Sequence, residues 1–210
     1  MRALVLCDDT WHPAETIRRG LQPLAGIGFE FDFAEDGAAW NATQMSRYPL
    51  TVLAKANITS SAMENPWLTA GTQAGFFEYV RGGGGLVAIH AGTCRYEKLN
   101  VMNDLIGGAF VQHPDQCEVR IEPKNKHPMT EGMAPFAVKD EHYFIQMDAK
   151  DADVFLHSRS EHGVQPAGWS RTEGIGRVCA LTPGHNLEVW LHPEFQKLLT
   201  NALRWAAKMN

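Results

Sequence analysis

The sequence predicts an α/β fold in which a mainly parallel β-sheet is covered by helices on both faces. Short apolar runs at residues 2–7, 29–34, 50–54 and 85–90 alternate with segments of helix length, which is typical of βαβ units. The helices that connect parallel strands pack on both sides of the sheet, so the strands are buried on both faces. We therefore expect a three-layer sandwich.

Three segments have apolar side chains at helical spacing, and each is expected to be a helix that packs on this sheet. They span residues 13–25, 65–81 and 193–209. The last segment carries a continuous apolar stripe and begins with a proline, a residue that the first turn of a helix accepts well.

From about residue 110 the sequence changes to strand-rich pieces separated by glycine, proline and charged turns. We expect these pieces to extend the same sheet and to add an antiparallel excursion. With no repeat or linker along the chain, residues 1–210 are predicted to form a single domain. The strand-rich pieces span residues 117–122, 140–145, 153–158, 166–171 and 176–181.

The composition of the chain argues against several classes of binding partner. The formal charge is -5, and no basic stripe suggests contact with nucleic acid. The first apolar run is too short and too close to acidic residues for a secretion signal or a membrane span. The four cysteines form no CxxC pair or regular framework, which favours reduced thiols. We therefore expect a cytoplasmic protein with a small polar ligand and without nucleic-acid or membrane partners.

The glycine run at residues 82–85 does not predict a phosphate site. A phosphate cradle lies after a strand and at the start of a helix, where free N–H groups point at the anion. These glycines precede a strand, so we expect them to end the preceding helix and turn the chain into the sheet. No GxGxxG or Walker motif is present, and the motifs therefore indicate no nucleotide cofactor.

Polar residues follow the ends of several predicted strands. Asp9, Trp11 and His12 follow the first strand, His90 follows the fourth, and His185 follows the strand "GRVCAL". Ligands of open parallel sheets bind beyond the carboxyl ends of the strands. The three histidines are therefore expected to converge on one rim of the sheet.

His90 stands at the tip of a buried strand and is followed at once by the small residues Ala91 and Gly92. This layout is similar to a nucleophile elbow, in which a serine or cysteine occupies the tip. An imidazole acts instead as a proton carrier or metal ligand near neutral pH. We expect His90 to handle protons.

The segment "DEHYF" at residues 140–144 is interpreted as a strand or strand edge. Because successive side chains of a strand point to opposite faces, Glu141 and Tyr143 would lie on one face, with Asp140 and His142 on the other. A carboxylate beside a phenol suits proton transfer or metal binding. The alternative is an acidic edge exposed to solvent.

His113 follows the segment "LIGGAF" and is a candidate for the border of the site. Three tryptophans near the polar loops are candidates for stacking on the apolar face of a sugar ring. These are Trp11, Trp169 and Trp190.

A set of motifs runs in order along nearly the whole chain: "DTWHP", "GGGLVAIHAG", "GGAFVQHP", "HPMTEGM", "KDEHYF", "GRVCALTPGH" and "HPEFQKLLTNALRWA". As a set they resemble the ThuA-like, or trehalose-utilisation, family. The resemblance implies a flavodoxin-like sandwich of the class I glutamine amidotransferase type. It also implies a role in sugar metabolism connected with oxidised keto-glycosides, and metal binding in some members.

Amidotransferases of this fold carry a cysteine where the present sequence has His90. Cys94 lies four residues further on and does not take that place, so glutaminase activity is not expected. The family's polar positions match His12, His90, Glu141, Tyr143 and His185, and the commoner family pattern includes His113.

The first functional hypothesis is an enzyme that hydrolyses, eliminates from or isomerises a sugar or keto-glycoside with a divalent ion, Zn, Mn or Fe. The alternatives are a non-catalytic sugar-binding or assembly module and, ranked last, a hydrolase that uses Cys94. A homodimer is expected from the resemblance. For the enzyme, the metal ligands are His12, Glu141 and His185, the catalytic residues are His90, Glu141 and Tyr143, and the substrate-binding residues are Asp9, Trp11, His113 and Trp190.

Overall fold

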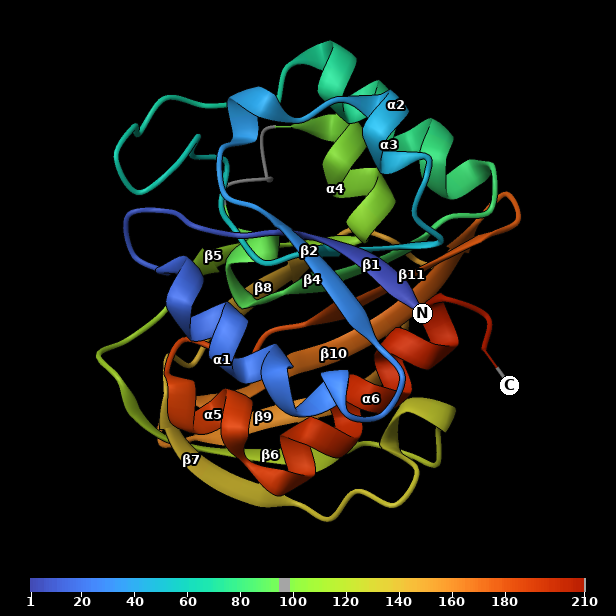
Figure 1. Cartoon of the computed structure of the whole chain (residues 1–210). Coiled ribbons are helices and arrows are strands. Elements are labelled where there is room, and N and C mark those ends of the chain that lie inside the picture. Colours follow the sequence, from blue (N-terminus) through green and yellow to red (C-terminus); the bar gives the residue numbers. More distant parts are fainter. Residues whose placement is uncertain (95–98, 210) are drawn as a thin grey trace.

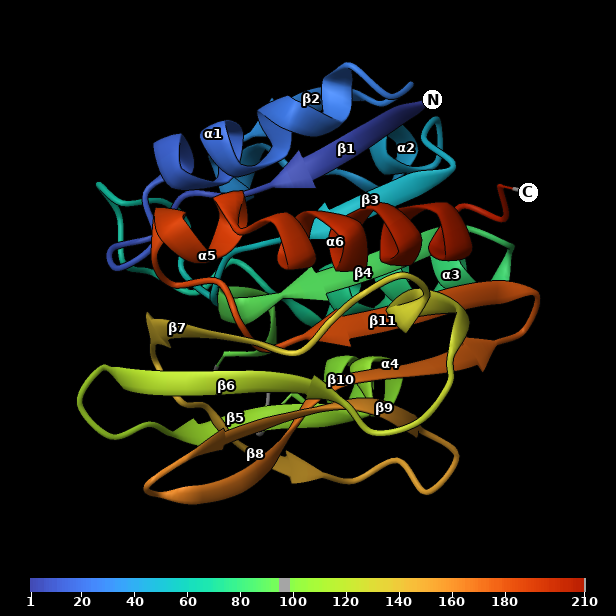
Figure 2. The same cartoon turned by 90° about the horizontal axis from the view of Figure 1, so that it is seen from below.

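The computed structural model describes residues 1–94 and 99–209, and it has three layers (Figure 1). A nine-stranded sheet lies between two groups of helices. Helices α1, α5 and α6 cover one face, and α2, α3 and α4 pack on the other (Figures 1 and 2). The predicted α/β sandwich of the flavodoxin and amidotransferase type is confirmed.

The first half of the sheet is parallel and has the strand order β2-β1-β3-β4-β11. All five residues of β4 are buried, as expected for a strand with helices on both faces. The strands are β1 (Arg2–Leu6), β2 (Glu30–Ala34), β3 (Leu50–Leu53), β4 (Gly85–Ile89) and β11 (Gly176–Leu181).

The second half is antiparallel and continues from β11 in the order β10-β9-β6-β7. It confirms the predicted antiparallel excursion. Two further strands, β5 and β8, form a small separate sheet. The strands of this half are β6 (Cys117–Pro123), β7 (Phe136–Asp140), β9 (Asp153–Ser160) and β10 (Gly163–Glu173), and the small sheet contains β5 (Gly108–Gln112) and β8 (Phe144–Met147).

The helices are α1 (Ala14–Ala25), α2 (Ala42–Met45), α3 (Ala70–Arg81), α4 (Asn100–Ile106), α5 (Leu187–Leu191) and α6 (Pro193–Ala206). The predicted helix over residues 65–81 starts only at Ala70. The side-chain oxygen of Asn57 accepts the N–H groups of Trp67 and Leu68, which holds that stretch extended, and Thr69 caps the helix. The glycines after α3 turn the chain toward β4 as predicted, with Gly83 at φ 113°.

The antiparallel half curls back toward the parallel half. Three strands separate β7 from β11 in the sheet order. The end of β7 nevertheless lies against the loop after β11, because the side chain of Asn186 donates a 3.0 Å hydrogen bond to the carbonyl of Lys139. The two views also show β7 beside α5 (Figures 1 and 2). This curl brings a loop from each half to the same edge of the sheet.

None of the four cysteines, all of which lie in the described residues, forms a disulfide bond, in agreement with the sequence prediction. Within residues 1–94 and 99–209, no helix combines the length and the apolar character that crossing a membrane requires.

Candidate metal centre

His12 is held in the loop after β1 by the carboxylate of Asp9. This carboxylate accepts the backbone N–H groups of Trp11, His12 and Ala56 at 2.8 to 3.0 Å, and it lies 2.8 Å from Nδ1 of the His12 ring. Because a carboxylate only accepts, the His12 proton is on Nδ1. The lone pair on Nε2 is therefore free for another partner, and this buried atom makes no hydrogen bond with the described residues.

His90 follows β4 in a left-handed conformation, with φ 47°. Its Nδ1 donates to the carbonyl of Thr182 at 2.7 Å, which leaves a lone pair on Nε2. The turn presses against β3, because a Cβ atom on Gly92 would lie 2.1 Å from the carbonyl oxygen of Leu53. Only glycine fits there, and the resulting sharp turn fixes the direction of the His90 ring.

His185 lies in the loop after β11. The preceding Gly184 has φ 138°, a value that side-chain-bearing residues rarely adopt. The two oxygens of the buried Asp140 accept the N–H groups of Gly184 and His185 at 2.9 and 3.0 Å. This pair of bonds sets the path of the loop, and with it the place of the imidazole.

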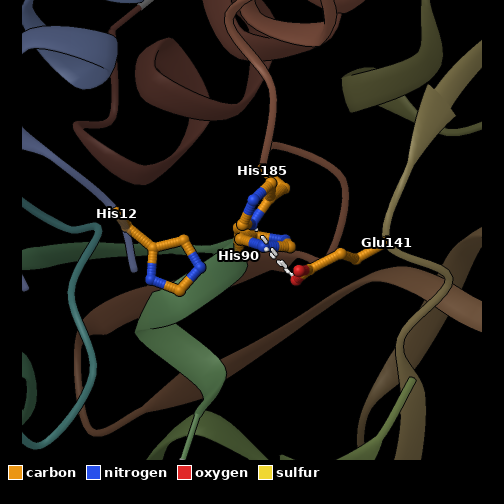
Figure 3. Close-up of side chains that lie close together, drawn as sticks. All are labelled: His12, His90, Glu141 and His185. Carbon is orange, nitrogen blue, oxygen red and sulfur yellow. Dashed lines mark ion pairs between the residues drawn. The ribbon is translucent and has the colours of Figure 1, made fainter. Parts of the chain in front are cut away.

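Glu141 comes from the antiparallel half, directly after β7, and points at the three imidazoles (Figure 3). Its Oε2 lies 3.3 Å from Nε2 of His90 and 3.2 Å from Nδ1 of His185, while Oε1 lies 3.6 Å from Nε2 of His113. One donor atom from each of His12, His90, Glu141 and His185 lies within 4.8 Å of the other three.

The charges in this cluster depend on one another. Burial raises the pKa of the Glu141 carboxyl, but pairing with His185 and His90 outweighs burial and holds this pKa well below its usual range. The same pairing raises the pKa of His185. Burial lowers the pKa of His12. At neutral pH the centre therefore combines an ionised carboxylate with a neutral His12.

This arrangement fits a divalent cation. The lone pair of His90 Nε2 faces a carboxylate oxygen, and two acceptors in contact repel each other unless a cation or proton lies between them. Three buried ring nitrogens that point into the cluster make no hydrogen bond with the described residues: Nε2 of His12, Nε2 of His90 and Nδ1 of His185. Imidazole and carboxylate ligands suit Zn, Mn and Fe. The residues present thus fit such an ion.

A cavity of about 420 Å³ opens above the cluster. His90 lies beneath it, only 1% exposed, and its ring stacks on Tyr143 with centroids 4.1 Å apart. The cavity is lined by Trp11, His12, Cys94, Phe110, His113, Glu141, Tyr143 and His185. A ligand in this cavity would contact three of the four clustered residues directly.

Comparison with known protein families identifies the chain. The model of the ThuA family, described as trehalose utilisation, matches residues 2–206. The chain belongs to the ThuA family. No curated protein matches this sequence.

Solved structures agree with this assignment. A ThuA-like protein from Parabacteroides merdae has a TM-score of 0.79 at 20% identity, over 99% of this chain and 90% of its own. A ThuA-like protein from Bacteroides uniformis has a TM-score of 0.73 at 21% identity, with 98% and 91% covered. The β-galactosidase of Rahnella sp. R3 matches with a TM-score of 0.71 at 14% identity, over 99% of this chain but 31% of its own. At these identities the likeness concerns the fold alone.

In this ThuA-family chain, the predicted convergence of His12, His90 and His185 is confirmed. His90, which the sequence predicts to handle protons, is 1% exposed beneath Tyr143 and is one of the four residues that could hold a metal ion. Tyr143 lines the cavity, and its Oη lies 3.1 Å from the sulfur of Cys94. Burial raises the pKa of this phenol well above its usual value, so it stays protonated.

The four predicted substrate contacts divide into two groups. Trp11, at 48% exposure, and His113 line the cavity. Asp9 is fully buried beside His12 and orients it rather than facing a ligand. Trp190 is 1% exposed and donates to the carbonyl of Gly184, so the prediction that it stacks on a sugar is wrong. Trp169 is buried in the same way and donates to the carbonyl of Ile106.

The predicted strand at residues 140–145 is interrupted. β7 ends at Asp140 and β8 begins at Phe144, because the chain crosses here from the large sheet to the small one. The predicted grouping of Glu141 with Tyr143 is confirmed, since both line the cavity. His142 is buried, and its ring nitrogens contact the hydroxyls of Ser158 and Ser160.

Sequence reasoning missed the residues that support the centre from behind. Asp140 and the carbonyl of Thr182 fix His185 and His90, respectively. Phe110, a wall of the cavity, was also missed. The only available signal for Asp140 was its place beside Glu141, and no local pattern tells that its carboxylate reaches a loop 44 residues away.

Proposed function

We propose that this ThuA-family protein is a metal-dependent enzyme of carbohydrate metabolism that acts on a sugar or keto-glycoside. One observation carries the proposal: three buried ring nitrogens and a carboxylate oxygen lie within 4.8 Å of one another at the floor of a cavity. Catalytic metal sites combine such ligands with room for water or substrate. The family's description as trehalose utilisation supports the substrate class.

In this proposal, His12, His90, Glu141 and His185 hold a divalent ion, Zn, Mn or Fe. Such an ion polarises a carbonyl group or acidifies a bound water when present. Asp9 and the Thr182 carbonyl hold the protons of His12 and His90 on Nδ1, so that both rings turn Nε2 toward the centre. Support of this kind is common behind metal-binding histidines.

Glu141 and His113 are the proposed groups for proton transfer. Oε1 of Glu141 lies on the cavity side, 3.6 Å from Nε2 of His113. Hydrolysis, elimination and isomerisation each require a proton to be moved near the reacting carbon, and a positioned acid or base contributes about 10²- to 10⁴-fold. Tyr143 remains a neutral phenol and can donate a hydrogen bond to a substrate oxygen.

The cavity walls suit a sugar ring. Trp11, Phe110 and Tyr143 offer aromatic faces, which pack against the apolar face of a pyranose. A volume of about 420 Å³ is near the lower end for small-molecule pockets, about 300–1,000 Å³. We therefore propose that one ring enters and that any aglycone extends past Trp11. The β-galactosidase that shares this fold in part of its chain is consistent with a carbohydrate role.

Metal analysis tests the ligand assignment. The wild-type protein is expected to hold about one divalent ion per chain, and His12→Ala and His185→Ala are expected to lose most of it. His162→Ala changes an exposed histidine on the β9–β10 turn and should hold as much metal as the wild type. Equal metal content in all four proteins would show that the ligand assignment is wrong.

Turnover separates the enzyme from the alternative function. Metal-loaded protein is incubated with keto-glycosides and with the matching unoxidised glycosides, and the freed sugar or isomer is measured. Turnover of the keto-glycosides is expected. Metal binding and saturable sugar binding without turnover would favour a sugar-binding module, which the exposed Trp11 at the cavity mouth also suits.

We also propose a cytoplasmic setting without nucleic-acid or membrane partners. The net charge of -5 and four cysteines that form no disulfide bond support this setting. Homodimerisation, which the family resemblance implies, is proposed on that ground, and sedimentation velocity tests it.

A further inference from the structure

The candidate metal centre is assembled from both halves of the sheet. Its three imidazoles are carried by loops after β1, β4 and β11 of the parallel half, whereas Glu141 follows β7 at the far edge of the antiparallel half. The distance of 3.2 Å between Glu141 and His185 therefore depends on how the two halves meet.

The two halves meet at a seam, which we define as the contact between the end of β7 and residues 184–186. Asp140 lies at its buried part, 1% exposed, and both of its oxygens accept backbone N–H groups across the seam. Asn186 lies at its outer part and donates to the carbonyl of Lys139 and to the side chain of Gln116, each at 3.0 Å.

Asp140 has an unusual place in the chain. The next residue is Glu141, and one of the groups that Asp140 binds is the N–H of His185. A single carboxylate thus fixes the backbone of two candidate ligands from opposite halves. Each of its oxygens accepts from one N–H group, so neither oxygen can be exchanged for a donor without the loss of a bond. An N–H group left unpaired by the loss of the carboxylate would be costly in this buried place.

We propose that Asp140 is a positioning residue for the metal centre: it holds Glu141 opposite the imidazoles and so sets how tightly, and in what geometry, the centre binds its ion. This inference rests on the proposed metal site. Asp9 orients the ring of His12 directly, whereas Asp140 acts through the backbone of the neighbouring loop. Without the Asp140 carboxylate, the seam loses the two hydrogen bonds at its buried part, and Glu141 and the His185 loop are held together less firmly.

The test uses Co²⁺ as the probe, because its visible absorption reports coordination geometry. Asp140→Asn keeps the shape of the side chain but places an NH₂ group against one backbone N–H. We expect Co²⁺ affinity about 10- to 100-fold below wild type, as for other residues that support metal ligands, and an altered absorption band. Asn201→Ala, on α6, is the control. It removes two hydrogen bonds from a side chain to the backbone carbonyls of Met129 and Glu131, which lie outside the seam. It should bind Co²⁺ as the wild type does.

A double-mutant cycle with Glu141→Gln completes the test. If Asp140 acts through Glu141, the two substitutions together should weaken Co²⁺ binding by less than the product of their separate effects. Folding is checked by circular dichroism. Should Asp140→Asn fail to fold, Asn186→Ala takes its place, because it loosens the same seam and is expected to weaken binding in the same direction by a smaller factor.

The outcomes distinguish the two proposals. A folded Asp140→Asn with wild-type Co²⁺ affinity and spectrum overturns the positioning role and leaves the metal site standing. If Asn186→Ala has to serve in its place, wild-type behaviour of that variant overturns the role equally. A wild-type protein that binds no Co²⁺ overturns the metal site, and the role of Asp140 falls with it.

Discussion

The parallel and antiparallel halves of the sheet differ in burial and in what they give to the centre. Every residue of β3 and β4 is buried, because helices cover both faces. On β6 only alternate positions are buried: Val119 and Ile121 face the core, while Glu118 and Arg120 face solvent. The parallel half supplies the three imidazoles, and the antiparallel half supplies the carboxylate.

The two halves also position their candidate ligands in different ways. The parallel half fixes its histidines by local means, namely a turn at each strand end and one acceptor behind each of His12 and His90. The antiparallel half places Glu141 by long-range means, through the curl of the sheet and the contact of Asp140 with the loop after β11. We therefore expect the imidazole part of the site to be the more rigid one.

The largest expected effect is the loss of metal affinity when a ligand is removed from one half of the sheet or from the other. His90→Ala removes an imidazole ligand that is buried and fixed, and we expect divalent-metal affinity to fall by more than about 100-fold, which is the upper end for residues that support a ligand. Glu141→Gln leaves three imidazoles and an amide oxygen in place, and we expect a smaller fall. Calorimetric titration with Zn²⁺ measures both. A greater loss for Glu141→Gln would show that the antiparallel half, not the parallel half, dominates binding.

A pair of glycine substitutions compares the tightness of packing in the two halves. Gly92→Ala would place a Cβ atom 2.1 Å from a backbone oxygen of β3, so we expect the free energy of unfolding to fall by about 3 kcal/mol or more. Gly132→Ala meets open space at φ 70° and should cost only about 1–2 kcal/mol. Urea unfolding measures both, and equal losses would contradict the difference in packing.

The smallest effect concerns a thiol at the end of β1. Burial raises the pKa of the Cys7 thiol to about 12, above its ordinary value of 9.0. Between these values the unfolded chain has released the thiol proton and the folded chain has kept it, so stability is full below about pH 9 and decreases as the pH rises toward 12. The expected slope is up to about 1.4 kcal/mol per pH unit.

Urea unfolding between pH 7 and 10.5 measures this slope. Cys7→Ala should make the slope less steep without abolishing it, because burial also raises the pKa of the Cys179 thiol, which remains in the variant. Cys117→Ala, on β6 of the antiparallel half, leaves Cys7 in place and should keep the decrease. An unchanged slope in Cys7→Ala would assign the decrease to other groups.

The sequence predicted the parallel half closely. The strand predicted at residues 2–7 is β1 (Arg2–Leu6), and the one predicted at 85–90 is β4 (Gly85–Ile89), because short apolar runs between turns carry the whole signal of a buried strand. The places of His12, His90 and His185 followed from their positions in the segments after strand ends. These are local features, and local features are visible in a single sequence.

Long-range features were less visible. Nothing within residues 140–145 tells that the chain leaves the large sheet after Asp140 and enters the small one at Phe144, or that the Asp140 carboxylate reaches the N–H groups of residues 184 and 185. The failure at Trp190 has another reason. Its position beside a polar loop is compatible with exposure, and only the packing of α5 between α1 and α6 buries the ring. Contacts between distant segments decided both cases.

The position of His90 has a consequence for how this scaffold does its chemistry. At the end of such a strand, a side chain ordinarily meets the incoming molecule. Here the ring lies under Tyr143, is hydrogen-bonded to the protein's own backbone and has almost no surface exposed to water. In the proposed site His90 is therefore a buried ligand, and an incoming molecule contacts the side chains that line the cavity instead.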